Sequence, residues 1–181
     1  MTVWISKYGD RLCLKLRTIM YLTKFILIFF AVLLLSTKAM SNSSEQSVSM
    51  VLDNFHQAAA QADGNTYFSL LSKNAVFLGT DASERWSKTE FKSFAKPYFS
   101  KGKGWTYLPR DRHINFSPDG QTAWFDELLD NTSYGECRGT GVLVKVGERW
   151  LISQYHLTIP LPNALVDEIT ERIDQHKKQL K

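Results

Sequence analysis

The alternation of apolar and polar residues is most regular late in the chain. Three apolar-rich runs, at 122–129, 134–146 and 150–159, are separated by short polar segments at 130–133 and 147–148. Tight turns between such runs, with no helix-period pattern inside them, are typical of an antiparallel meander. A preceding run at 105–116 joins them through Ser117-Pro118-Asp119-Gly120-Gln121, whose residues favour a tight turn. We therefore predict four consecutive antiparallel strands.

Helical spacing dominates the region before these strands. Apolar residues one turn apart predict a helix over 48–62, and Asp63-Gly64-Asn65 breaks it and caps a short second helix that carries Tyr67, Leu70 and Leu71. The motif S-x-x-E at 87–90 predicts a capping box and hence the start of a third helix, which Pro97 should bend or end.

Two further elements complete the pattern. A short β-leaning run at 75–78 predicts a strand, followed by a small hairpin to 84–86. After the meander, Pro160 and Pro162 stop the last strand, and Asn163 caps a final amphipathic helix. The predicted fold class is α+β: N-terminal helices packed on a strongly curved antiparallel sheet that forms a cone-shaped cavity, plus a C-terminal helix.

The first forty residues differ in kind from the rest. Residues 25–35 are eleven apolar residues without a charge, preceded by a basic segment and followed by small and polar residues. This pattern predicts a secretory signal peptide over 1–41, a linker over 42–47, a domain over 48–162 and the C-terminal helix over 163–181. The alternatives are an uncleaved membrane anchor and a buried helix. The true start is Met1 or Met20.

The leader accounts for the basic net charge. Residues 1–41 hold six of the 22 lysines and arginines and one of the 18 acidic residues, so the remainder carries 16 basic and 17 acidic residues. We therefore expect no nucleic-acid binding, and membrane contact only through an uncleaved leader. With Cys13 in the leader, Cys137 has no partner for an internal disulfide, and no residue spacing indicates a metal site.

Several short motifs in the domain occur in a characteristic order. They are 77–81 (FLGTD), 84–86 (ERW), 104–105 (GW), 110–112 (RDR), 123–127 (AWFDE), 139–143 (GTGVL), Trp150 and 162–163 (PN). Together they resemble the SnoaL-like branch of the nuclear transport factor 2 superfamily, over roughly residues 48–165. The resemblance implies a cystatin-like fold and a homodimer, whereas the activity stays open, because that scaffold serves isomerases, dehydratases, cyclases, ligand binders and association domains.

The turns also predict which side chains meet across the sheet. The turn between the last two strands places Gly139 opposite His156, and the turn before it places Asp126 opposite Gly139. The first hairpin turn brings Arg112 opposite Asp126. An arginine beside a carboxylate, with a histidine across a glycine gap, can hold charge and exchange protons near neutral pH. The alternative interpretation is a purely structural pair between Arg112 and Asp126.

This row defines the candidate site. Asp126 and His156 are the candidate catalytic residues, and the glycines can leave room for a ligand or mark a bulge. The full candidate binding set comprises Trp86, Arg112, Trp124, Asp126, Gly139, Gln154 and His156. The opposite, outer face is expected to carry Phe125, Val142, Val144, Tyr155 and Leu157, together with a surface ion pair between Glu127 and Arg138.

Three functions follow from these features. The first is an exported domain, periplasmic or secreted, that binds a small, partly apolar molecule in its cone. The second is an isomerase, dehydratase or cyclase that uses Asp126 and His156 as acid and base. The third is a dimerisation or association domain that meets a second copy through the outer sheet face. No phosphate-binding glycine loop or ligand cluster implies a cofactor.

Overall fold

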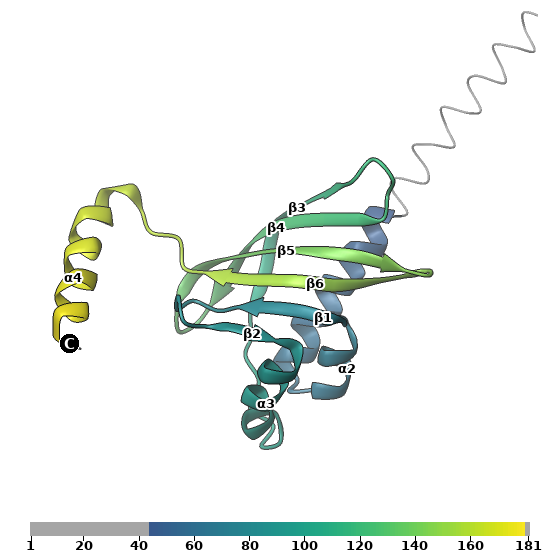
Figure 1. Cartoon of the computed structure of the whole chain (residues 1–181), viewed down its shortest axis with the longest axis horizontal. Helices are drawn as coiled ribbons and strands as arrows, with labels where there is room; N and C mark the ends of the chain where they lie inside the picture. Colours follow the sequence, from purple (N-terminus) through teal and green to yellow (C-terminus); the bar gives the residue numbers. More distant parts are fainter. Residues whose placement is uncertain (1–43, 180–181) are drawn as a thin grey trace, which may run out of the picture. The chain divides into compact units, whose positions relative to one another are not determined.

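The protein is described from a computed structural model, which places residues 44–179. Residues 44–60 are helical. The elements that follow are α2 (Gly64–Ser69), β1 (Leu71–Leu78), β2 (Arg85–Ser87), α3 (Lys88–Phe99), β3 (Leu108–Phe116), β4 (Thr122–Asn131), β5 (Gly135–Val146), β6 (Arg149–Thr158), a 3-10 turn (Asn163–Leu165) and α4 (Val166–Gln179) (Figure 1).

The strands of the described region form one sheet in the order β2-β1-β6-β5-β4-β3. Neighbouring strands run antiparallel except β1 and β6, which run parallel. The predicted α+β class is confirmed, but the sheet is mixed. The parallel pair arises because the long connection through α3 and the meander returns the chain beside β1 in the same direction.

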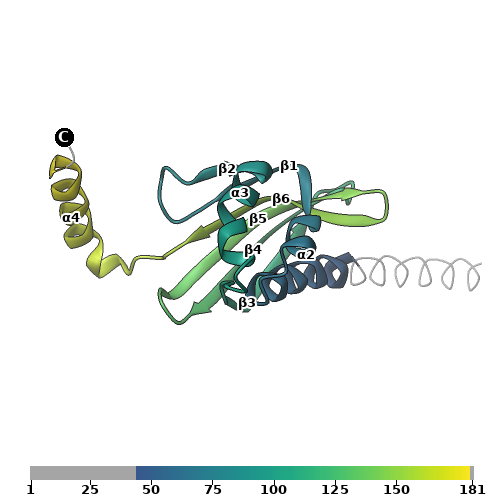
Figure 2. The ribbon, with the colours of Figure 1, turned by 90° about the horizontal axis from the view of Figure 1, so that it is seen from below.

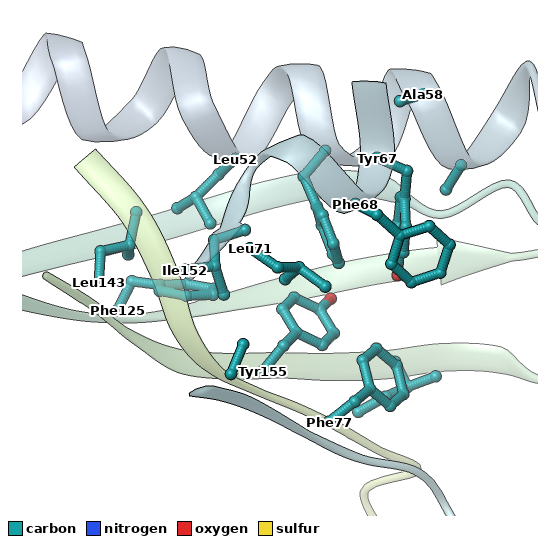
Figure 3. Close-up of a cluster of buried hydrophobic side chains, with 14 of the residues drawn as sticks. Leu52, Ala58, Tyr67, Phe68, Leu71, Phe77, Phe125, Leu143, Ile152 and Tyr155 are labelled. Atoms are coloured by element: carbon teal, nitrogen blue, oxygen red, sulfur yellow. The ribbon is translucent and has the colours of Figure 1, made fainter. Parts of the chain in front are cut away.

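The helices before the meander cover one face of the sheet (Figure 2). Phe55 of the 44–60 helix stacks against Tyr67 of α2 at 4.3 Å between ring centroids and lies 4.9 Å from Tyr155 of β6. Phe77 of β1 stacks on Phe91 of α3 at 3.9 Å. These rings and the aliphatic residues in Figure 3 form the core between helices and sheet.

The caps of α2 and α3 form as the sequence predicts. The Ser87 hydroxyl accepts from the Glu90 N–H, and the Glu90 carboxylate accepts from the Ser87 N–H, which is a complete capping box. The Asp63 carboxylate accepts from the Thr66 N–H at the start of α2. Pro97 does not end α3, which continues to Phe99.

Several predicted boundaries need correction. Residues 44–47, part of the predicted linker, are already helical, whereas the predicted leader lies outside the described residues. The first strand begins at Leu71 rather than residue 75, because α2 is short and ends at Ser69. In α4 no side chain is buried. Within residues 44–179, no helix has the length and hydropathy needed to cross a membrane.

The predicted register of the β4–β5 hairpin is wrong by one residue. Asn131, not Asp130, pairs with Gly135, because the Asn131 side chain accepts hydrogen bonds from the Ser133 and Tyr134 N–H groups and closes a three-residue loop. Gly135 has a φ of +71°, which favours glycine. Since side chains alternate across a strand, a slip of one residue moves every side chain to the other face.

Two bulges complete the difference in register. Val146 pairs with Arg149 as predicted, but an extra residue, Ser153, shifts β6 so that Gly141 faces Tyr155 and Gly139 faces Leu157. A second bulge, in β3, lies between Arg110 and His113.

The first hairpin differs as well. Phe116 pairs with Ala123, whereas the predicted register placed it opposite Thr122. The loop of this hairpin is therefore one residue longer than predicted. As a result Arg112 does not pair with Asp126, and the predicted row of Arg112, Asp126, Gly139 and His156 does not form.

Candidate functional site

A chain of charged side chains joins the sheet to the 44–60 helix. Glu127 on β4 holds Arg112 of β3 through one carboxylate oxygen, with Nε to Oε2 at 2.7 Å. Its other oxygen, Oε1, lies 2.6 Å from Nε2 of His56 on the helix. Arg112 Nη1 also donates to Asp53 Oδ1 at 2.7 Å and to Ser49 Oγ at 2.8 Å. The sheet and the helix are therefore linked by ionic and polar contacts as well as by apolar packing.

The centre of this network is shielded from solvent. The Glu127 side chain is 0% exposed and that of Arg112 is 12% exposed, whereas Asp53 at the edge is 60% exposed. Burial alone lowers the pKa of the Arg112 guanidinium, but the charges and hydrogen bonds of Glu127 and Asp53 outweigh it, so its pKa is raised. Arg112 therefore stays charged and neutralises the buried Glu127 carboxylate.

Backbone geometry places both halves of the network. Asp111 has a φ of +49°, a conformation that aspartate tolerates, and it forms the β3 bulge that turns Arg112 toward the helices. On the helix, Ser49, Asp53 and His56 are spaced by four and three residues and so lie on one face.

His56 also lines a cavity of about 230 Å³ between the helices and the sheet. Because Nε2 of His56 is taken by Glu127, Nδ1 is the ring nitrogen left for a ligand. The lining is mainly aromatic: Phe55, His56, Ala59, Tyr67, Phe77, Gly79, Thr80, Glu84, Trp86, Phe91, Phe94, Trp105, Tyr107, Tyr134, Tyr155 and Leu157.

A loop that lies against the helix brings Trp105 into this lining. The backbone N–H of Trp105 donates to the Ala59 carbonyl at 3.2 Å. A Cβ on Gly104 would lie 2.0 Å from that carbonyl oxygen, so only glycine allows the approach.

Two tyrosine hydroxyls add polarity to the interior. Tyr67 reaches down from the helical layer and Tyr155 up from the sheet (Figure 3). The Tyr67 hydroxyl is buried and forms no hydrogen bond of good geometry among the described residues, although the Trp105 side chain lies close enough to offset part of the rise in its pKa that burial causes. Burial raises the pKa of Tyr67 well above its usual value, and burial together with the nearby Glu127 carboxylate does the same for Tyr155. Both hydroxyls therefore stay protonated and can donate to a ligand oxygen.

Of the residues predicted from the sequence, Trp86 lines the cavity. Arg112 lies on the inner face and reaches the cavity only through Glu127 and His56. Gly139 is also on the inner face, but the space above it is filled: a Cβ there would lie 2.7 Å from the Tyr155 hydroxyl.

The remaining predicted site residues lie on the outer face. Trp124 is 46% exposed, and Asp126, Gln154 and His156 alternate with buried neighbours. Asp126 pairs with Thr140, which pairs with His156, so these two share a face but point away from the cavity. The slipped β4–β5 register and the Ser153 bulge explain the error.

The expected outer face also needs correction. Phe125, Tyr155 and Leu157 are buried in the core, and Glu127 is buried with Arg112 rather than paired with Arg138 at the surface. Of the five apolar residues predicted there, Val142 and Val144 remain on the outer side.

Sequence reasoning missed His56, Glu127, Tyr67 and Tyr155 as site residues. One signal was available for Glu127, which alternates with Phe125 and Leu129 and must share their inner face. Within residues 44–179, no group of three or more histidine, cysteine or acidic side chains is arranged to hold a metal ion.

Comparison with known families agrees with this geometry. The sequence profile of the SnoaL-like domain matches residues 48–162. The chain belongs to the SnoaL-like family. The resemblance predicted from the sequence motifs is thereby confirmed, and the cavity lies within the matched SnoaL-like region.

Solved structures share the fold of this SnoaL-like domain at low sequence identity. A proposed dehydratase of the NTF2-like family from Streptomyces avermitilis has a TM-score of 0.59 and 15% identity, over 67% of this chain and 99% of that one. An NTF2-like protein of unknown function from Pseudomonas putida has a TM-score of 0.57 and 12% identity, over 67% and 90%.

A proposed scytalone dehydratase from Novosphingobium aromaticivorans has a TM-score of 0.56 and 9% identity, over 68% of this chain and 89% of that one. Among curated proteins, none matches the sequence. At these identities the comparisons establish the fold of the SnoaL-like domain and leave its chemistry to be argued from the site.

We predict that Glu127→Gln destabilises the protein far more than Asp53→Asn. Removing the Glu127 charge leaves the buried Arg112 guanidinium without its main partner, a change that typically costs about 3 kcal/mol or more. The Asp53 side chain is largely exposed, so its loss should cost less than about 1 kcal/mol. Urea unfolding of both variants measures the difference, and equal losses would contradict a buried ionic centre.

We also predict that stability falls above about pH 10, the ordinary pKa of tyrosine. Burial raises the pKa of Tyr107 to about 12, and those of Tyr67 and Tyr155 also rise, so the unfolded chain ionises first. The contribution of these tyrosines to the free energy of unfolding is therefore complete below pH 10. It is lost as the pH rises through their pKa values in the folded protein.

The measurement is the free energy of unfolding from urea titrations at pH 9 and pH 11. Each unit by which folding raises a tyrosine pKa contributes about 1.4 kcal/mol to the loss of unfolding free energy at high pH. Tyr107→Phe should reduce the dependence on pH, whereas Tyr98→Phe, on the exposed surface of α3, should not. Identical slopes for the two variants would contradict the assignment.

Proposed function

We propose that this SnoaL-like domain binds a small, ring-containing molecule in the aromatic cavity. The observation that carries the proposal is the lining itself: ten of its residues are phenylalanine, tyrosine or tryptophan, while His56, Tyr67 and Tyr155 add polar groups. A concave, mainly apolar site with a few convergent polar groups is the usual form of a small-molecule site.

The polar groups indicate which functional groups the ligand carries. Nε2 of His56 is bonded to the Glu127 carboxylate, so Nδ1 is the ring nitrogen left for a ligand, and it is an acceptor in the tautomer whose Nε2 carries the proton. The buried Tyr67 hydroxyl lacks a partner among the described residues and supplies a donor. A ligand with one O–H or N–H group and one acceptor oxygen satisfies both.

The cavity volume limits the ligand's size. An apolar protein cavity of about 150 Å³ can hold benzene. A space of about 230 Å³ therefore suits one ring with a short substituent, or two small fused rings.

A second candidate function, acid–base catalysis, is favoured by the 2.6 Å contact between His56 and Glu127. A buried carboxylate that holds one imidazole nitrogen orients the ring and stabilises the imidazolium that forms when the other nitrogen takes a proton. The catalytic pair predicted from the sequence, Asp126 and His156, lies outside the cavity, and His56 takes the place of the base. Isomerases and dehydratases are among the proteins built on this scaffold, and a proton transfer of this kind serves both reactions.

We predict that neutral one-ring and two-ring compounds raise the melting temperature of the protein, whereas four-ring compounds do not. A matched pair of variants on β6 tests the location. Leu157→Phe fills the cavity and should abolish the shift, while Leu151→Phe, on the outer side of the same strand, should preserve it. Equal effects of both variants, or shifts by large ligands alone, would place binding elsewhere.

We further predict that the protein catalyses hydrogen–deuterium exchange at the carbon beside the carbonyl of a bound ring ketone in heavy water. Proton NMR of the ketone follows the exchange. His56→Gln should slow it at least about a hundredfold, the usual contribution of a general base, and leave the dissociation constant within a few-fold. The variants Asp126→Asn and His156→Gln, which change the outer-face pair, should catalyse the exchange at the rate of the unaltered protein. If His56→Gln catalyses the exchange at that rate too, His56 is not the base, and only the binding function remains proposed.

A further inference from the structure

The mouth of the cavity carries a negative charge without a positive counterpart. Glu84 lines the cavity, and no lysine or arginine does. Among the described ion pairs none involves Glu84. Its one described side-chain hydrogen bond is accepted from the Asp81 N–H, at 3.2 Å. A carboxylate with several lone pairs therefore remains open to a ligand.

The fold places this carboxylate over Gly79. A Cβ on Gly79 would lie 2.1 Å from Glu84 Oε2 and 2.9 Å from Glu84 Cβ, so the Glu84 side chain lies over Gly79 in space that any other residue there would fill. The Gly79 N–H donates to the Glu84 carbonyl at 2.9 Å, which holds the two residues face to face across the β1–β2 turn. Gly79 itself lines the cavity.

Aromatic rings continue from this carboxylate into the cavity. Trp86, two residues after Glu84, also lines it, and its ring stacks on Phe94 at 5.1 Å and on Phe91 at 5.4 Å. The faces of such rings carry partial negative charge and attract cations, most strongly for tryptophan. A carboxylate beside an aromatic wall is a combination that recognises alkylammonium groups.

We propose that the cavity selects ring compounds that carry an ammonium group, with the ring inside the cavity and the ammonium between Glu84 and Trp86. This inference rests on the proposed binding function and specifies its ligand class: a neutral ring with a protonated amine at its end. Carboxylate and phosphate ligands are disfavoured, because the lining offers them no cation and Glu84 repels them.

The test uses three compounds that share a phenyl ring and differ in the charge of a short side chain: phenethylamine, 2-phenylethanol and 3-phenylpropionate. Calorimetric titration of the full chain at pH 7 gives each dissociation constant. We expect phenethylamine to bind about tenfold more tightly than the alcohol, consistent with a partly desolvated cation contact, and the carboxylate at least about tenfold more weakly than the alcohol. Added salt should weaken amine binding and leave alcohol binding nearly unchanged.

Variants of the hairpin assign the effect. In Glu84→Gln the dissociation constants of the amine and the alcohol should lie within about twofold of each other, and that of the alcohol should not rise. Gly79→Ala keeps the carboxylate but displaces it, and should reduce the preference for the amine in the same way. Asp81→Asn, in the same turn, is the control, because Asp81 is exposed and its carboxylate is bonded to Ser83. This variant should bind the three compounds in the same order of affinity as the unaltered protein.

The outcomes separate this inference from the proposed function. If the alcohol binds but the amine binds no more tightly, or the carboxylate binds best, the ammonium assignment is overturned and the proposed binding of ring compounds stands. A preference for the amine that persists in Glu84→Gln also overturns it. If none of the three compounds binds, the proposed function and this inference both fall.

Discussion

The buried carboxylate of Glu127 is the constraint on which the rest of this site depends. A charge in the interior needs compensation, and Arg112 supplies it from the neighbouring strand while His56 occupies the remaining oxygen from the helix above. Each of these contacts fixes a different element: β3 through its bulge, β4 through Glu127 itself, and the 44–60 helix through His56 and Asp53. The ionic network, together with the apolar packing of Phe55, therefore holds the helix on the sheet beside the cavity.

The same contacts that secure the helix also prepare the chemistry. A free histidine side chain adopts several rotamers, and the contact of Nε2 with a buried carboxylate restricts the His56 ring, which lines the cavity. Arg112 holds one oxygen of Glu127 and leaves the other for the imidazole, so Glu127 orients the His56 ring. Structural and functional interpretations of the Arg112–Glu127 pair are thus compatible, because a pair that stabilises the fold also positions His56, the proposed base.

The sequence predicted the fold well and the site poorly, for a physical reason. Helices, caps and strands follow from local patterns: the capping box at Ser87 and Glu90 formed as expected, and the family profile matches residues 48–162. Which residues meet across the sheet depends instead on single-residue events. The Asn131 turn and the extra residue at Ser153 each shift the register by one, and each shift exchanges the two faces of a strand. Asp126 and His156 were therefore placed in the cavity when they lie on the outer face.

Such register errors can be avoided in part by giving burial more weight than turn geometry. On β4 the alternation of Phe125, Glu127 and Leu129 requires that an acidic residue face inward wherever the two apolar residues do, whatever the length of the hairpin loop. An acidic residue forced into the core needs a basic partner, and the RDR motif on the preceding strand offers one in Arg112. The remaining oxygen then needs a donor from the helical layer, where His56 adjoins Phe55 in the buried stripe. Followed in this order, the need to compensate one buried charge leads from β4 to the neighbouring strand and the helical layer with less dependence on the hairpin turns.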